Sequence, residues 1–150
     1  MVTVFKWILQ LIGWSRFVAE QPEDLRPAAA QFQHQFNTTG ITSAVITLIF
    51  VVAAAVALYY FWWNKSSSET FKYRYRLRWW TLWLFGTAIL VAGSTFGVMR
   101  LMLLEQIFRT GAYWTVSFCC ALYSIPVFAI GSIFAAKVFA KHTNASCTPF

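Results

Sequence analysis

The side chains best suited to binding chemistry are concentrated between residues 71 and 80, where the chain reads FKYRYRLRWW. Large apolar or aromatic residues separate four bases at every second position: Lys72, Arg74, Arg76 and Arg78. Ammonium and guanidinium groups bind phosphates and carboxylates, so the chemistry expected of this segment is the binding of an anionic partner. A period of two places all four bases on one side of an extended chain, whereas a helix divides them between two sectors. We therefore expect residues 71–78 to be extended.

Three anionic partners would suit this segment. Anionic lipid headgroups require nothing beyond the charges, and the strand or acidic face of another protein would also use the alternation. Nucleic acid would use the same residue types through stacking and charge. A loop of some 15 residues held at both ends offers it little surface, so we predict binding to anionic lipids or protein subunits and no nucleic acid.

Arg100 and Glu105 form a second charged set, five residues apart. This spacing is too far round a helix for an ideal ion pair on one face. One interpretation is that the two charges mark the point where a helix leaves a membrane. The other is a charged ring at the mouth of a pore built from several copies.

Catalytic and metal-binding patterns are not evident. Cys119 and Cys120 are adjacent in an apolar run, Cys147 is near the C-terminus, and no CxxC pair is present. His34 and His142 lie in polar segments and are better explained as solvated residues. With no paired carboxylates and no glycine-rich phosphate loop, the sequence predicts no enzyme, no metal and no cofactor.

The composition identifies the class of protein that must position these groups. Of the 150 residues, 59% are hydrophobic and only 11% are charged, whereas a soluble domain carries roughly 25% charged residues. An integral membrane protein is therefore expected. The net charge of +7 then fits topology signals and anionic headgroups better than nucleic-acid binding.

Three runs without charge predict transmembrane helices at about 41–63, 79–99 and 113–136. The 23 residues of the first run make about 35 Å of helix, enough to cross a hydrocarbon core of roughly 30 Å. The first run ends in Tyr59, Tyr60, Trp62 and Trp63, the aromatic belt expected at an interface. The predicted fold is an all-α integral membrane protein in which residues 41–136 form the transmembrane domain.

The N-terminal part is less apolar. Residues 1–19 have a sparse polar stripe at helical spacing, which favours an amphipathic helix lying in the interface, with a weakly spanning helix as the alternative. Residues 20–40 form a polar, non-cytoplasmic segment in which a short helix is plausible from Ala28 to Phe36.

The distribution of bases predicts the orientation in a cytoplasmic or inner-type membrane. The loop 64–78 holds Lys65 and the four alternating bases, and Lys137 and Lys141 follow the last span. The positive-inside rule therefore places the loop 64–78 and the tail 137–150 in the cytoplasm.

Small residues at helical spacing predict helix packing. In the second span these are Gly86, Gly93 and Gly97, of which the last two make a GxxxG, and in the third span they are Gly131 and Ala135. Such positions let two backbones approach closely. They could serve packing within the chain, packing between subunits, or both.

Together these features predict a small structural or assembly subunit of a multi-subunit membrane complex, of the secretion, conjugation, motility or respiratory type. The alternative is a self-assembling channel or holin-like pore. Only Thr87, Ser94 and Thr95 in the second span suggest a polar face for a lumen.

Overall fold

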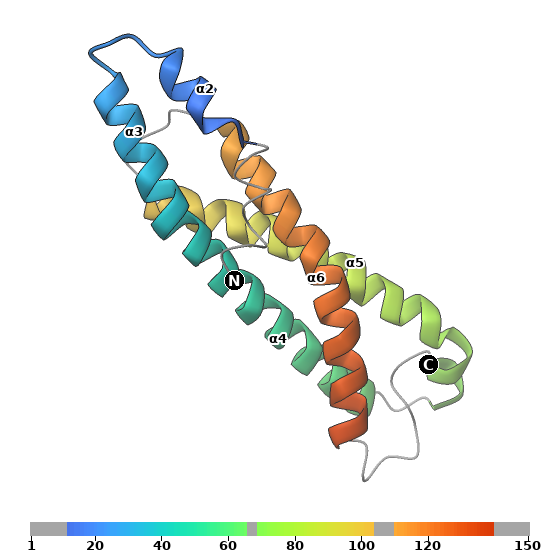
Figure 1. Cartoon of the computed structure of the whole chain (residues 1–150). Coiled ribbons are helices and arrows are strands. Elements are labelled where there is room, and N and C mark those ends of the chain that lie inside the picture. The colour runs from blue at the N-terminus through green and yellow to red at the C-terminus, as the bar shows by residue number, and fades with distance from the viewer. Residues whose placement is uncertain (1–11, 66–68, 104–109, 140–150) are drawn as a thin grey trace. The chain divides into compact units, whose positions relative to one another are not determined.

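The computed structural model describes residues 12–65, 69–103 and 110–139, and the regular elements in these ranges are all helical (Figure 1). They are, in chain order, α2 (Trp14–Ala19), α3 (Arg26–Gln35), the π-helical turn η1 (Phe36–Gly40), α4 (Ile41–Lys65), α5 (Glu69–Met102) and α6 (Thr110–Phe139).

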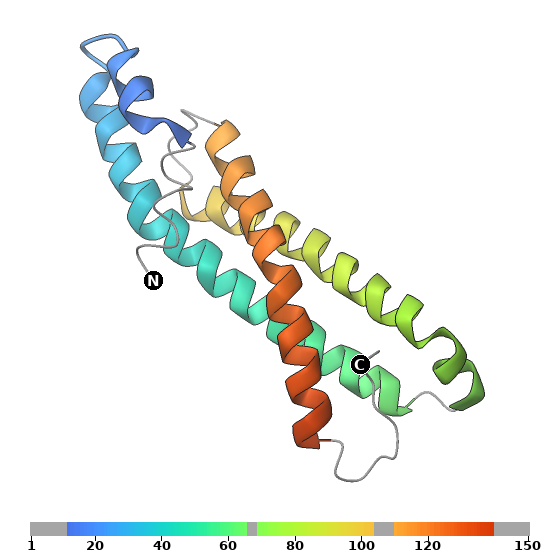
Figure 2. The ribbon, with the colours of Figure 1, turned by 45° about the vertical axis from the view of Figure 1, so that its right-hand side comes forward.

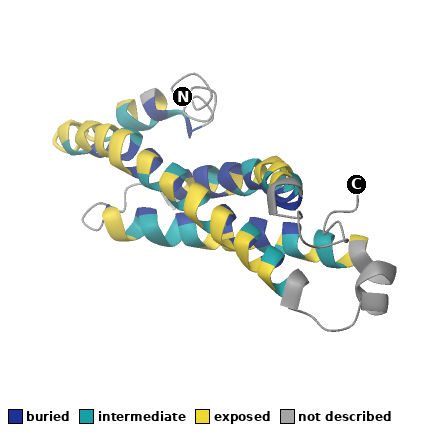
Figure 3. Cartoon of the chain, turned by 90° about the horizontal axis from the view of Figure 1, so that it is seen from below, coloured by how far each residue is buried: buried dark blue, intermediate teal, exposed yellow. Residues whose placement is uncertain are grey.

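Three helical stretches are long and apolar enough to cross a membrane: Arg26–Trp62, Leu77–Met102 and Gly111–Ala136. They contain nearly all of the three predicted spans, so the prediction of an all-helical chain with three candidate spans is confirmed for the described residues. Only 28% to 33% of the residues in their most apolar stretches are buried. Each long helix therefore turns much apolar surface outward (Figure 3), which is compatible with surrounding lipid.

The first of these stretches begins earlier than predicted, because α3 continues through η1 into α4. Pro27 lies in the first turn of α3, where its missing N–H costs no helical hydrogen bond. The Thr38 hydroxyl does not end the helix but donates back to the His34 carbonyl at 2.8 Å. Most of the predicted polar segment 20–40 is therefore helical and continuous with the first span.

The basic segment also differs from its prediction. Helix α5 begins at Glu69 and includes residues 71–78, so the expected extended conformation is wrong. A helix satisfies its own backbone hydrogen bonds, whereas an isolated extended segment beside a membrane would need a partner strand. The need for backbone hydrogen bonds therefore outweighs the preference of the alternating side chains for an extended conformation.

The predicted helix over residues 1–19 is interrupted at Gly13. This glycine has a φ of 62°, a left-handed conformation, and α2 begins at the next residue. Trp14 is buried. Residues 1–11 lie outside the described ranges.

The chain divides into two compact units, which are described separately below. The first unit comprises the described residues within Met1–Thr47 and Ala92–Cys120, and the second those within Leu48–Val91 and Ala121–Phe150.

An aromatic cluster forms the core of the first unit. The Trp14 ring packs edge-on against Phe32 and Phe36, with centroids 5.7 Å and 5.2 Å away. Phe36 in turn meets Tyr113 of α6 at 5.3 Å. Helix α2 thereby folds back beside α3, with Trp14 packed against Phe32 (Figure 2).

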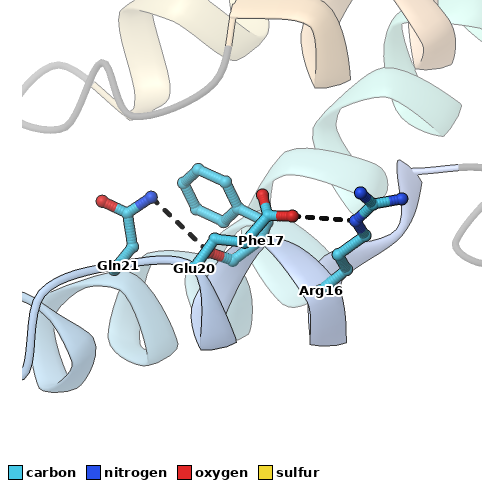
Figure 4. Close-up of polar contacts among 4 residues, drawn as sticks. All are labelled: Arg16, Phe17, Glu20 and Gln21. Carbon is cyan, nitrogen blue, oxygen red and sulfur yellow. Dashed lines mark hydrogen bonds and ion pairs between the residues drawn. The ribbon is translucent and has the colours of Figure 1, made fainter.

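The outer side of α2 carries polar contacts (Figure 4). Arg16 and Glu20 form an ion pair at 2.8 Å, and Gln21 Nε2 donates to the Phe17 carbonyl at 3.5 Å. Because both charged side chains of the pair are largely exposed, it contributes at most about 1 kcal/mol. The aromatic packing beneath α2 holds it more strongly.

A second aromatic cluster forms the core of the second unit. Tyr59, which is only 1% exposed, packs against Trp83 of α5 at 5.8 Å and Phe128 of α6 at 6.1 Å. Trp80 Nε1 also joins α5 to α6 by donating to Ser132 Oγ at 3.0 Å. Tyr59 therefore packs inside the chain and is not a belt residue, which corrects the sequence prediction at that position.

Candidate functional site

Helices α4 and α6 approach each other closely at Gly131 in the second unit. A β-carbon added to this glycine would lie 3.3 Å from Val56 Cγ2, tighter than ordinary van der Waals contact. Ala135, one turn further along α6, is buried. These two small residues of the third span therefore let α6 pack closely on α4 within the chain.

A groove of about 820 Å³ lies between α4 and α6 in the second unit. Its lining runs from Ile49 to Phe61 on α4 and from Val127 to Ala135 on α6, and among these described residues only Tyr60 has a polar side-chain atom. We call this feature the α4–α6 groove. Three alanines and a glycine are part of its lining, and these small side chains leave space between the two helices.

The GxxxG of α5 has a different environment in the first unit. A β-carbon at Gly93 or Gly97 would meet no described atom within 4 Å, and Gly93 is exposed. Leu101 follows at the same spacing and is 66% exposed. We call Gly93, Gly97 and Leu101 the outer face of α5. Gly86, in the second unit, likewise has open space beside it.

The hydroxyls that suggested a lumen face are largely used within α5. Thr87 and Thr95 are buried. Their hydroxyls donate to the carbonyls of Trp83 at 2.6 Å and Ala92 at 3.1 Å. Ser94 is half-buried. The two threonines are therefore buried within their own chain, with their hydroxyls bonded to carbonyls of α5.

Arg100 lies against aromatic rings of the first unit. Its guanidinium carbon is 5.9 Å from the ring centroids of both Phe96 and Tyr113. This arrangement stabilises the cation by roughly 0.5–1 kcal/mol where the site stays hydrated, and by more where it is dry. Glu105 lies outside the described residues, so its relation to Arg100 remains a prediction.

The structure describes the side chains of only part of the basic segment 71–78. Arg78 is exposed, whereas the side chains of Lys72, Arg74 and Arg76 are outside the described set. Among the described residues, no three histidine, cysteine or acidic side chains gather to hold a metal ion.

Compared with protein-family models, with curated proteins and with solved structures, the chain gives no significant match.

Sequence reasoning missed the α4–α6 groove and both aromatic clusters. Ala53 and Ala57, four residues apart, indicate a narrow side of α4, but their spacing does not say which helix approaches that side. Likewise, the spacing of Trp14, Phe32 and Phe36 carries no signal until α2 folds back on α3.

Proposed function

We propose that this chain is a small structural subunit of a larger membrane-embedded assembly and performs no catalysis of its own. The observation that carries the proposal is the outer face of α5. It combines two glycines at GxxxG spacing with an exposed leucine, and the first unit leaves the space beside both glycines open.

Such a face suits a helix from another chain. In lipid, helices associate through close packing of backbones, because hydrocarbon tails compete equally for ordinary apolar side chains. A glycine that packs against nothing in its own chain also costs roughly 1 kcal/mol relative to alanine in a helix. A partner helix could pack directly against the backbone at these glycines, and that contact would offset the loss of helix stability.

The proposed setting is a cytoplasmic or inner-type membrane. The basic segment from Lys65 to Arg78 and the C-terminal residues lie on the cytoplasmic side in this proposal, near anionic lipid headgroups. A secretion, conjugation, motility or respiratory-type assembly would accommodate a subunit with such short polar segments. The companion subunits are further copies of this chain or different membrane proteins.

Variants of the outer face test this proposal. Gly93→Leu and Gly97→Leu should leave the chain itself folded, since no described atom obstructs the new side chains, but they should abolish co-purification of partner chains after gentle detergent extraction. Ala54→Leu is the matched control, because Ala54 is an exposed small residue on α4.

Retention of the same partners by the glycine variants would contradict the proposed docking face. Ion flux through liposomes containing only the purified chain would instead support the self-assembling pore.

A further inference from the structure

We infer that the α4–α6 groove binds one acyl chain of an anionic phospholipid, whose phosphate lies at the end of the groove nearest Lys65 and Lys137. The inference requires the chain to lie in a membrane. It does not require the chain to be a subunit of an assembly, so the two proposals can fail separately.

The length of the groove fits an acyl chain of one leaflet. Its lining on α4 extends over the twelve steps from Ile49 to Phe61, which correspond to about 18 Å along the helix axis. One leaflet contributes half of the hydrocarbon core, about 15 Å. A helix from another protein would have to cross the whole core of about 30 Å, and the groove matches only half of that path.

The chemistry of the groove also fits hydrocarbon. Its lining is aliphatic or aromatic apart from the Tyr60 hydroxyl. Tyr60 lies near the C-terminal end of α4, at the same end of the groove as Lys65. The volume of about 820 Å³ is within the range of roughly 300–1,000 Å³ typical of ligand sites. A void of this size beside lipid would not stay empty, because its walls would lose their dispersion contacts.

The positions of charge along the helices identify the headgroup. Helix α4 ends at Lys65, four residues beyond Phe61, and α6 continues to Lys137, two residues beyond Ala135. Because both helices run towards the same end of the groove, both lysine positions follow its last lining residues. The exposed Arg78 is the second residue of the membrane-length stretch Leu77–Met102 and precedes Trp79, whose ring meets Trp62 of α4 at 5.1 Å. The sequence places one acid, Glu69, among the bases that follow α4, and no acid after Glu105, so bases are in excess at this end. This balance complements a phosphate diester with net negative charge.

Two alanines offer a direct test. Ala57 and Ala53 line the groove and are exposed, whereas Ala54 is exposed but does not line it. Phenylalanine at position 57 or 53 should occupy the volume of the acyl chain, and Ala54→Phe is the matched control. Each purified variant is titrated with phosphatidylglycerol or with phosphatidylcholine of the same acyl chains, and native mass spectrometry counts the lipids bound to each chain.

We expect the natural chain and Ala54→Phe to bind one phosphatidylglycerol, and Ala57→Phe and Ala53→Phe to bind it about tenfold more weakly, as expected when a filled site must repack. Replacing Lys65 and Lys137 together by glutamine should reduce the preference for phosphatidylglycerol over phosphatidylcholine by about 25-fold, at roughly fivefold for each base. Arg16→Gln, which removes a charge from the first unit, should leave this preference unchanged.

Two results would overturn the inference. Equal lipid binding by Ala57→Phe, Ala53→Phe and Ala54→Phe would show that the groove does not hold the chain of the lipid. A change in oligomeric mass with no change in lipid count would show that the groove holds a helix of a second copy. Far-ultraviolet circular dichroism of each variant verifies that it remains helical, so that lost binding reports on the groove.

Discussion

Gly131 gives the sharpest test of how α4 and α6 pack. Its replacement by leucine would drive a branched side chain into Val56, whose Cγ2 atom is already 3.3 Å from the position of the first added carbon. Overpacking of this kind costs roughly 1–3 kcal/mol. Alanine should cost little, because a shift of a few tenths of an ångström is offset by the better helix propensity of alanine, worth about 1 kcal/mol.

The assay is reversible unfolding in mixed detergent micelles, followed by tryptophan fluorescence and circular dichroism. We expect Gly131→Leu to lower the free energy of unfolding by about 2 kcal/mol, and Gly131→Ala to leave it nearly unchanged. Gly93→Leu is the control within the chain, because no described atom lies within 4 Å of its added carbon.

A second substitution identifies the partner of Gly131. Val56→Ala removes the obstructing methyl groups, so it should cost less in the Gly131→Leu background than in the natural chain, with a coupling of at least about 1 kcal/mol. The reasoning is refuted if Gly131→Leu and Gly93→Leu are tolerated equally, or if the coupling with Val56→Ala is zero.

Three further contacts, each within one of the two units, are tested by the same unfolding measurement. Trp80→Phe and Ser132→Ala remove the two ends of a 3.0 Å hydrogen bond, so a double-mutant cycle should give a coupling of about 0.6–1.7 kcal/mol; additive losses would argue against the bond. Trp14 is buried and its Nε1 has no hydrogen-bond partner among the described residues, so Trp14→Phe should cost far less than Trp14→Ala, for which about 3–5 kcal/mol is expected. Equal losses would contradict a role for ring packing at this position. Arg100→Gln should lower stability by about 1 kcal/mol through loss of the ring contacts, and the same substitution in a Tyr113→Leu background should cost less. An unchanged cost in that background would exclude the contact with Tyr113.

The sequence predicted the three long apolar helices well because they depend on composition over some twenty residues. Hydropathy identifies such helices without any information on which helix packs against which. The first long helix begins earlier than predicted for a local reason, because proline and threonine are residue types common at helix starts. In the structure Pro27 occupies a first turn of α3, and Thr38 lies within the π-helical turn η1.

Interactions between distant residues were beyond the sequence alone. The terminal aromatic residues of the first span have the composition of an interfacial belt, yet Tyr59 packs between α5 and α6. The alternation at residues 71–78 indicates a strand. A strand needs the edge of another strand for its backbone hydrogen bonds, whereas a helix forms these bonds within its own backbone. The glycines illustrate the same limit. Gly93 and Gly131 have equivalent patterns, and only the structure shows that Gly131 meets Val56 whereas Gly93 has open space.

The central claim, that this chain is a structural subunit, is tested most directly by the mass of the particle extracted gently from its native membrane. We predict a particle of fixed stoichiometry that contains this 17.2 kDa chain together with further membrane chains, and that loses them in Gly97→Leu but not in Ala54→Leu. Extraction of the chain alone as a monomer, from membranes in which it is fully folded, would contradict the account.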